Sequence, residues 1–122
     1  GTQLIYSDGS DQIHFLSNQS RAISHSISVT ENGRPVRKLN ELEWIDGKIW
    51  ANVWQTDRVV IINPQSGEVE GNIDLSGLLP ASDRHATTDV LNGIARNPDD
   101  GSIWVTGKRW PWLYQIELLP LN

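Results

Sequence analysis

A short motif that returns at a fixed interval constrains the fold of this 122-residue chain more than any other feature. The tetrapeptide GKIW at 47–50 recurs as GSIW at 101–104, an offset of 54 residues. The dipeptide LN at 39–40 recurs at 91–92, an offset of 52 residues. A period of about 45–54 residues with four short strands in each unit is typical of a β-propeller.

The strand pattern supports this interpretation. The stretch DQIHFLSNQS at 11–20 parallels DRVVIINPQS at 57–66, and short alternating runs end at turn residues along the whole chain. Three Asp-Gly dipeptides are expected to supply the positive φ of tight turns; they begin at Asp8, Asp46 and Asp100. The one helix candidate, residues 75–84, is broken by Pro80. Strands are expected at 4–7, 13–16, 22–29, 41–45, 49–54, 59–63, 69–75, 92–97, 102–107 and 113–118.

We therefore predict an all-β fold, a β-propeller segment of about two and a half four-stranded blades. In this single partial domain of residues 1–122, residues 1–38 would end one blade, 39–79 would form a complete blade and 80–122 most of a third. The chain opens in strand-like sequence, as if cut from a longer protein. An open arc exposes faces that neighbouring blades should cover. We therefore expect either a homodimer or completion by a missing N-terminal half.

Charge and composition exclude several functions. The formal net charge of −5 argues against a nucleic-acid or anionic-membrane partner, because both need a basic surface. The chain has no cysteine, and its three histidines are scattered without metal-ligand spacing, so no metal is expected. No apolar run is long enough to span a membrane, and no signal peptide is visible. The basic residues Arg34, Arg37 and Lys38 follow a turn and are interpreted as a solvated loop.

At the level of motifs the chain resembles a known family. LNELEWIDGKIWANVWQTD at 39–57, DVLNGIA at 89–95 and GSIWVTGKRWPWLYQIEL at 101–118 resemble, in order, the glutaminyl cyclases (glutamine cyclotransferases) of plants and bacteria. These enzymes are distinct from the zinc-dependent animal type. The resemblance implies the C-terminal half of a five-bladed propeller that acts on peptides or proteins with an N-terminal glutamine. It also implies formation of pyroglutamate with release of ammonia, no cofactor, and an extracytoplasmic (periplasmic or secreted) location.

Three residues match pocket positions of that family, namely Asn40, Trp54 and Lys108. The amide of Asn40 can donate or accept, Trp54 offers a wall with an indole N–H, and Lys108 offers a cation for an oxyanion. Trp54 and Lys108 are 54 residues apart, so the repeat places them at equivalent positions of successive blades. By contrast, Trp50 and Trp104 lie mid-strand beside isoleucine and are expected to pack between blades.

The acid–base group is the least defined part of the hypothesis. A carboxylate must take a proton from the attacking amine and protonate the leaving nitrogen. Glu41 and Glu43 lie on one face of a predicted strand, and Glu41 is a catalytic candidate. The family, however, has its catalytic glutamate in an earlier blade. Two alternatives therefore stay open: a catalytically incompetent propeller fragment that binds peptides or serves as scaffold, and a metal-dependent lactonase-like propeller using Asn40, Asn52 and Asn92.

Overall fold

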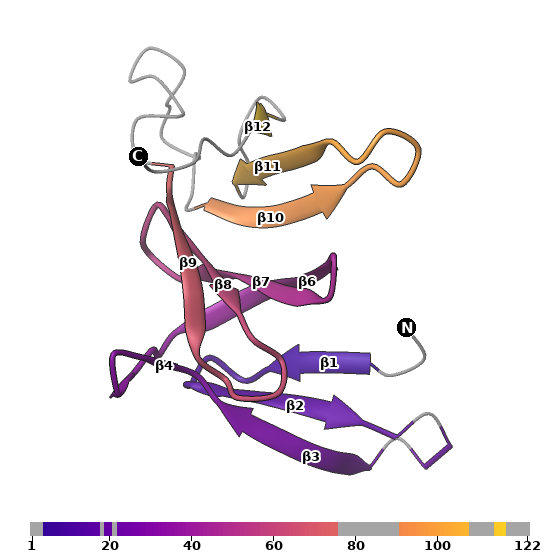
Figure 1. The fold of residues 1–122 in the computed structure, drawn as a ribbon, viewed down its shortest axis with the longest axis vertical. Helices are drawn as coiled ribbons and strands as arrows, with labels where there is room; N and C mark the ends of the chain where they lie inside the picture. The colour runs from indigo at the N-terminus through magenta and orange to yellow at the C-terminus, as the bar shows by residue number, and fades with distance from the viewer. Residues whose placement is uncertain (1–3, 18, 21, 76–90, 108–113, 117–122) are drawn as a thin grey trace.

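A computed structural model describes residues 4–17, 19–20, 22–75, 91–107 and 114–116. These residues form three antiparallel sheets and one short hairpin, and no helix occurs among them. The sheets follow one another along the length of the molecule in sequence order (Figure 1). The predicted all-β class is thereby confirmed, and the helix candidate at 75–84 falls almost wholly outside the described residues.

The first sheet has three strands in the order β1-β2-β3. They are β1 (Leu4–Ser7), β2 (Gln12–Leu16) and β3 (Ile23–Ser28). Side chains of β2 alternate, so that Ile13 and Phe15 are buried while their neighbours are only partly covered. A small hairpin of β4 (Thr30–Glu31) and β5 (Arg34–Pro35) follows and leads into the second sheet.

The middle sheet has four strands in sequence order. They are β6 (Leu39–Ile45), β7 (Lys48–Val53), β8 (Arg58–Ile62) and β9 (Val69–Asp74). Strand β7 is buried at five successive positions, 49–53, which is unlike the alternation of a half-exposed strand. Strand β7 of the middle sheet is therefore covered on both faces.

The third sheet contains β10 (Leu91–Arg96), β11 (Ile103–Gly107) and β12 (Tyr114–Ile116). Its strand β10 contacts β6 and β7 of the middle sheet. The side chain of Asn52, which is fully buried, reaches across this junction, and its Oδ1 accepts a hydrogen bond from the Gly93 backbone N–H at 3.2 Å.

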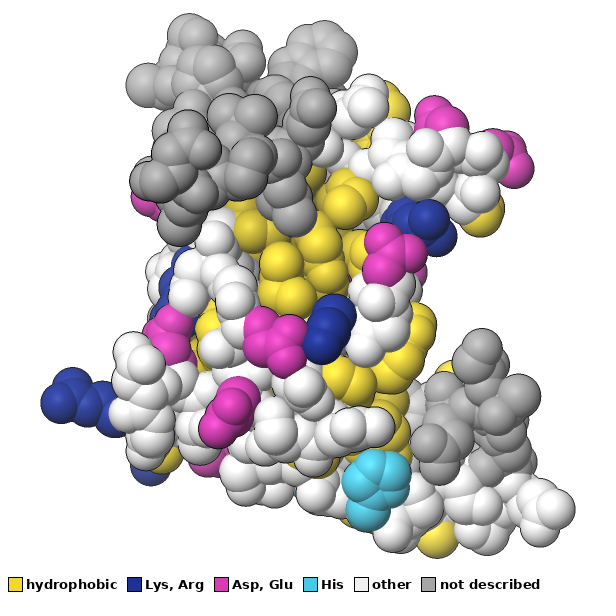
Figure 2. All heavy atoms as spheres, viewed as in Figure 1, with side chains coloured by type: hydrophobic (Ala, Val, Ile, Leu, Met, Phe, Trp, Pro, Cys, Tyr) yellow, Lys and Arg dark blue, Asp and Glu magenta, His cyan; other side chains and the backbone are white. Residues whose placement is uncertain are grey.

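Two apolar cores join the three sheets. One lies between the first and middle sheets and includes Ile13, Phe15, Leu39 and Ile49. The other lies between the middle and third sheets and includes Ile45, Trp50, Val59, Leu75, Ile94 and Val105. Figure 2 shows hydrophobic side chains gathered at this second junction. Three up-and-down sheets packed face to face have the form of a propeller segment with one four-stranded and two three-stranded blades.

The repeat seen in the sequence is also present in the hydrogen bonding. The Val29 N–H donates to the Asp11 carbonyl at 2.8 Å, and the Leu75 N–H donates to the Asp57 carbonyl at 2.7 Å. Both donor and acceptor are shifted by 46 residues between the two sheets.

The boundaries between blades after residues 38 and 79 remain our proposal. Strand β6 begins at Leu39, directly after the first of these boundaries, and residue 79 lies outside the described residues.

The Asp-Gly dipeptides differ from one another. At Asp46-Gly47 both residues have positive φ, 49° and 79°, as a two-residue primed hairpin needs. At the other two dipeptides only Gly9 and Gly101 have positive φ, because these turns belong to longer loops. A second primed turn at Asn32-Gly33, with φ of 52° and 78°, closes the β4–β5 hairpin.

Candidate functional site

Two of the three predicted pocket residues line the same hollow. Asn40 and Trp54 face a depression of about 250 Å³ together with Gly9, Lys38 and Leu39. Typical ligand pockets enclose about 300–1,000 Å³. The hollow is therefore somewhat smaller than a typical ligand pocket.

Asn40 is placed by an irregularity in β6. The pairing of β6 with β7 shifts between Leu39 and Leu42, which is the mark of a β-bulge. A bulge re-aims side chains and often lies next to a functional site. Strand β10 has the same shift between Leu91 and Ile94, so the bulge recurs at the equivalent place of the next sheet.

Trp54 follows β7 directly and is held by the backbone rather than by packing. Its N–H donates to the Lys38 carbonyl at 2.7 Å, while 45% of its surface stays exposed. Lys38 (φ 62°) and Gln55 (φ 65°) flank this contact in the left-handed region. Such a conformation is costly for residues other than glycine and is concentrated at functional sites. The backbone therefore presents an indole face to solvent beside Asn40.

The loop between β1 and β2 forms the third side of the hollow. The Lys38 N–H donates to the Gly9 carbonyl at 3.1 Å, and the Leu39 N–H donates to the Ser10 carbonyl at 3.3 Å. The Ser7 hydroxyl lies 3.0 Å from the Leu39 carbonyl and 3.1 Å from the Asn40 carbonyl. These contacts attach the first sheet to the start of β6, where Asn40 lies.

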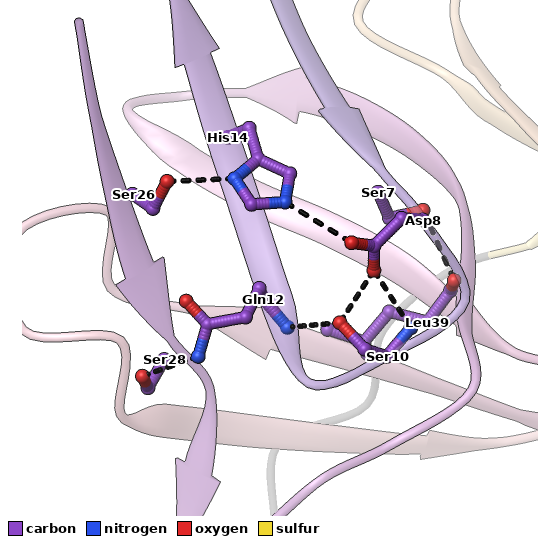
Figure 3. A network of polar contacts seen from close by, with 8 residues as sticks. All are labelled: Ser7, Asp8, Ser10, Gln12, His14, Ser26, Ser28 and Leu39. Carbon is purple, nitrogen blue, oxygen red and sulfur yellow. Dashed lines mark hydrogen bonds and ion pairs between the residues drawn. The ribbon is translucent and has the colours of Figure 1, made fainter. Parts of the chain in front are cut away.

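A polar network fixes this loop (Figure 3). Oδ1 of Asp8 accepts hydrogen bonds from the Ser10 hydroxyl and, at 3.0 Å, from the Ser10 N–H. Oδ2 of Asp8 lies 3.2 Å from His14 Nε2, and His14 Nδ1 lies 2.6 Å from the Ser26 hydroxyl. The Ser10 hydroxyl and then His14 lower the pKa of Asp8 to about 2. Asp8 is therefore ionised at neutral pH.

Sequence reasoning missed Asp8, Gly9 and Lys38 as neighbours of the hollow. Asp8 precedes Trp54 by 46 residues, the offset that relates the first sheet to the middle sheet. The loop that contains it is thus equivalent to the loop that contains Trp54. Extending the repeat one blade toward the N-terminus would have identified it.

The two glutamates of β6 lie apart from the hollow. Glu41 is exposed and is not among the lining residues. Burial raises the pKa of Glu43, and the nearby charge of Glu41 raises it further, in agreement with the two side chains sharing a face. Glu41 as acid–base group therefore stays a prediction.

The other candidates are distributed as follows. Trp50 is 5% exposed and packs between the middle and third sheets, as expected. Lys108 lies outside the described residues.

Across the part of the chain that the structure describes, no three potential His, Asp or Glu metal ligands come together. Asn52 is fully buried at the junction of the middle and third sheets, where its Oδ1 accepts a hydrogen bond from the Gly93 N–H. The same described residues contain no helix long and apolar enough to cross a membrane.

The fold defines the class of the protein as a segment of a β-propeller, and the hollow lined by Asn40 and Trp54 lies where β6 begins and β7 ends. The family model for glutamine cyclotransferase matches residues 1–118. The chain belongs to the glutamine cyclotransferase family.

Two relatives extend this result. A glutaminyl-peptide cyclotransferase of Arabidopsis thaliana is 45% identical in an alignment covering 97% of this chain and 38% of that protein. The crystal structure of Myxococcus xanthus glutaminyl cyclase matches with a TM-score of 0.87 and 36% identity, covering 96% of this chain and 51% of that one. The chain therefore spans about half or less of the relatives' length.

Proposed function

We propose that this chain is part of a glutaminyl-peptide cyclotransferase and supplies one wall of its substrate pocket. In this reaction the α-amine of an N-terminal glutamine attacks the δ-carbonyl carbon of the same residue. A C–N bond forms to close the pyroglutamate ring, the bond to the side-chain nitrogen breaks, and ammonia leaves. The observation that carries the proposal is that Asn40 and Trp54, both chosen from the sequence, line one hollow.

Each wall residue has a role in this reaction. The glutamine side chain must fold into a ring-like conformation before attack, and a flat indole such as Trp54 favours such folding by restricting the space. The Asn40 amide can hold the substrate amide or amine. Lys108, equivalent to Trp54 by the repeat, would stabilise the oxyanion that forms on the attacked carbonyl.

Two tryptophans of the middle sheet provide a matched test. Trp54 and Trp44 are similarly exposed, at 45% and 49%, but only Trp54 lines the hollow. We expect Trp54→Ala to slow ammonia release from a peptide beginning with glutamine by at least about 10-fold. Trp44→Ala should leave the rate nearly unchanged. Mass spectrometry of the peptide, which loses one ammonia, measures both. Asn40→Ala and Lys108→Ala should resemble Trp54→Ala, and equal rates in all variants would contradict the proposed pocket.

One observation favours a second candidate for the chain by itself. Among the described residues that line the hollow there is no carboxylate. Peptide binding without ammonia release above the spontaneous background would favour a non-catalytic peptide-binding or scaffold module. The extracytoplasmic location is part of the same proposal and rests on the family resemblance alone.

A further inference from the structure

A second and larger hollow lies beside the first. It has a volume of about 570 Å³, which falls within the range of ligand sites. The β4–β5 hairpin and the segment entering β6 form one side, and the β7–β8 region forms the other. Its lining includes three arginines, one glutamate and two valines: Arg34, Arg37, Arg58, Glu31, Val36 and Val53. We call it the arginine hollow.

One of the three arginines is already neutralised. Arg58 Nη2 lies 2.5 Å from Glu31 Oε1, and Arg58 Nε donates to Asn72 Oδ1 at 2.6 Å. Asn72 Nδ2 in turn donates to Glu31 Oε2 at 2.5 Å, which closes a triangle. The hydrogen bond from Asn72, followed by that from Arg58, lowers the pKa of Glu31. These three contacts hold this side of the hollow in place, and the charges of Arg58 and Glu31 cancel each other.

The other two arginines carry uncompensated charge. Arg34 and Arg37 are exposed, and neither has a carboxylate partner within the described parts of the chain. They fit the solvated loop expected from the sequence, but they also face a hollow with apolar surface from Val36 and Val53. A cationic hollow is a local exception in a chain whose formal net charge is −5.

The arginine hollow adjoins the candidate pocket through the backbone. Arg37 and Val53 line the arginine hollow, whereas the next residues, Lys38 and Trp54, line the smaller one. The 2.7 Å hydrogen bond from Trp54 N–H to the Lys38 carbonyl thus lies between the two. An extended peptide advances about 3.3–3.6 Å per residue. A substrate peptide that starts against Trp54 has to cross this backbone contact for its following residues to reach the arginines.

We propose that the arginine hollow is a substrate subsite that selects acidic residues shortly after the N-terminal glutamine. This inference rests on the proposed function of the smaller hollow. A guanidinium presents a planar fork that matches a carboxylate with two parallel hydrogen bonds. The rest of the chain is negatively charged and repels acidic peptides, which offsets part of their attraction to the two arginines. The arginines therefore mainly determine which glutamine peptides are preferred, rather than how tightly such peptides bind in general.

The test uses two peptides that differ only in charge. Both begin with glutamine, and residues two to four are glutamates in one and the isosteric glutamines in the other. Ammonia release and binding by calorimetry are measured for each on the purified protein. We expect the acidic peptide to be favoured about 5-fold at low salt, the size of an exposed ion pair, and less at high salt.

Variants connect this preference to the hollow. The double variant Arg34→Gln, Arg37→Gln should abolish the preference, because it removes the two uncompensated charges. Arg96→Gln is the matched control, since Arg96 is paired with Asp46 at 3.6 Å and does not line the hollow. A preference that survives in the double variant, or that Arg96→Gln removes equally, would overturn the subsite.

The outcomes separate this inference from the proposed function. Equal cyclisation and equal binding of the two peptides overturn the subsite and leave the cyclotransferase proposal intact. Arginine-dependent preference in binding without any ammonia release supports the subsite and overturns the catalytic competence of the chain. An N-acetylated acidic peptide that binds as tightly as the free one overturns the subsite, because the arginines would then act as a general anion site.

Discussion

The backbone N–H of Trp54 donates to the carbonyl of Lys38 at 2.7 Å, which connects the end of β7 to the residue before β6. Lys38 has a φ of 62°, in the left-handed region. A chain turn at Lys38 therefore positions both hollows: Asn40 and Trp54 lie on one side, and Arg37 and Val53 lie on the other. The geometry of the candidate site depends on a backbone conformation that its sequence does not favour.

Substitutions at Lys38 should therefore change stability through the backbone. A β-branched residue is strongly disfavoured in the left-handed region, so Lys38→Val should lower the free energy of unfolding by about 1–2 kcal/mol. Lys38→Gly should be neutral or slightly stabilising, because glycine adopts this φ without steric cost. Urea denaturation measures both. Arg37→Val is the control, since it removes the same charge one residue away, and a cost equal to that of Lys38→Val would contradict the explanation.

A close approach of two sheets gives a second prediction. A Cβ added at Gly67 would lie 2.1 Å from the Ser28 carbonyl oxygen, and Gly67 has a φ of 78°. The turn before β9 thus packs its backbone directly against β3. We expect Gly67→Ala to destabilise the chain by about 3 kcal/mol or more, because a backbone atom of another sheet must move.

Gly33 is a matched control for Gly67. Its φ is also 78°, but an added Cβ there meets no atom within 4 Å. Gly33→Ala should cost only about 1 kcal/mol, the price of the left-handed conformation. Thermal or urea unfolding of the two variants separates the contact from the conformation. Similar losses at both positions would show that Gly67 is required for its φ alone.

The exposed edge of the first sheet predicts self-association. Among the described residues β1 pairs with β2 only, and its Leu4 and Tyr6 are 50% and 37% exposed. An unpaired strand edge with apolar side chains promotes pairing with another chain. The isolated 122-residue chain should therefore form a dimer or larger assembly by light scattering. Leu4→Lys should shift the assembly toward monomer. Leu16 lies on β2, which is paired with a strand on each side, so Leu16→Lys should give monomer only if the sheet unfolds. A monomeric mass with cooperative unfolding of the original chain would contradict the prediction.

How much the sequence predicts depends on whether a feature repeats. The order of the ten main strands follows from alternation and turn residues. The position of both Trp54 and Asn40 in the lining of one hollow agrees with the family resemblance. The short hairpin of β4 and β5 was not expected, because two-residue strands leave no alternation to detect. The left-handed conformation of Lys38 was equally hidden, since lysine has no preference for it. The hollow between Arg34 and Arg58 depends on a contact between distant loops that only the folded chain creates.

Asp8 makes the loop beside the candidate pocket sensitive to acid. Hydrogen bonding from the Ser10 hydroxyl, and then from His14, lowers the pKa of Asp8 from 3.8 to about 2. A carboxyl whose pKa is lower in the folded state contributes stability above its unfolded pKa and loses it as pH falls through the folded pKa. Asp8→Asn should therefore lower the urea midpoint at pH 6, and its difference from the original chain should shrink between pH 4 and pH 2. Asp99→Asn is the control, because Asp99 is an exposed carboxylate whose side chain has no hydrogen-bonding partner within the described residues. An identical pH dependence of the two variants would show that the Asp8 network does not stabilise the loop.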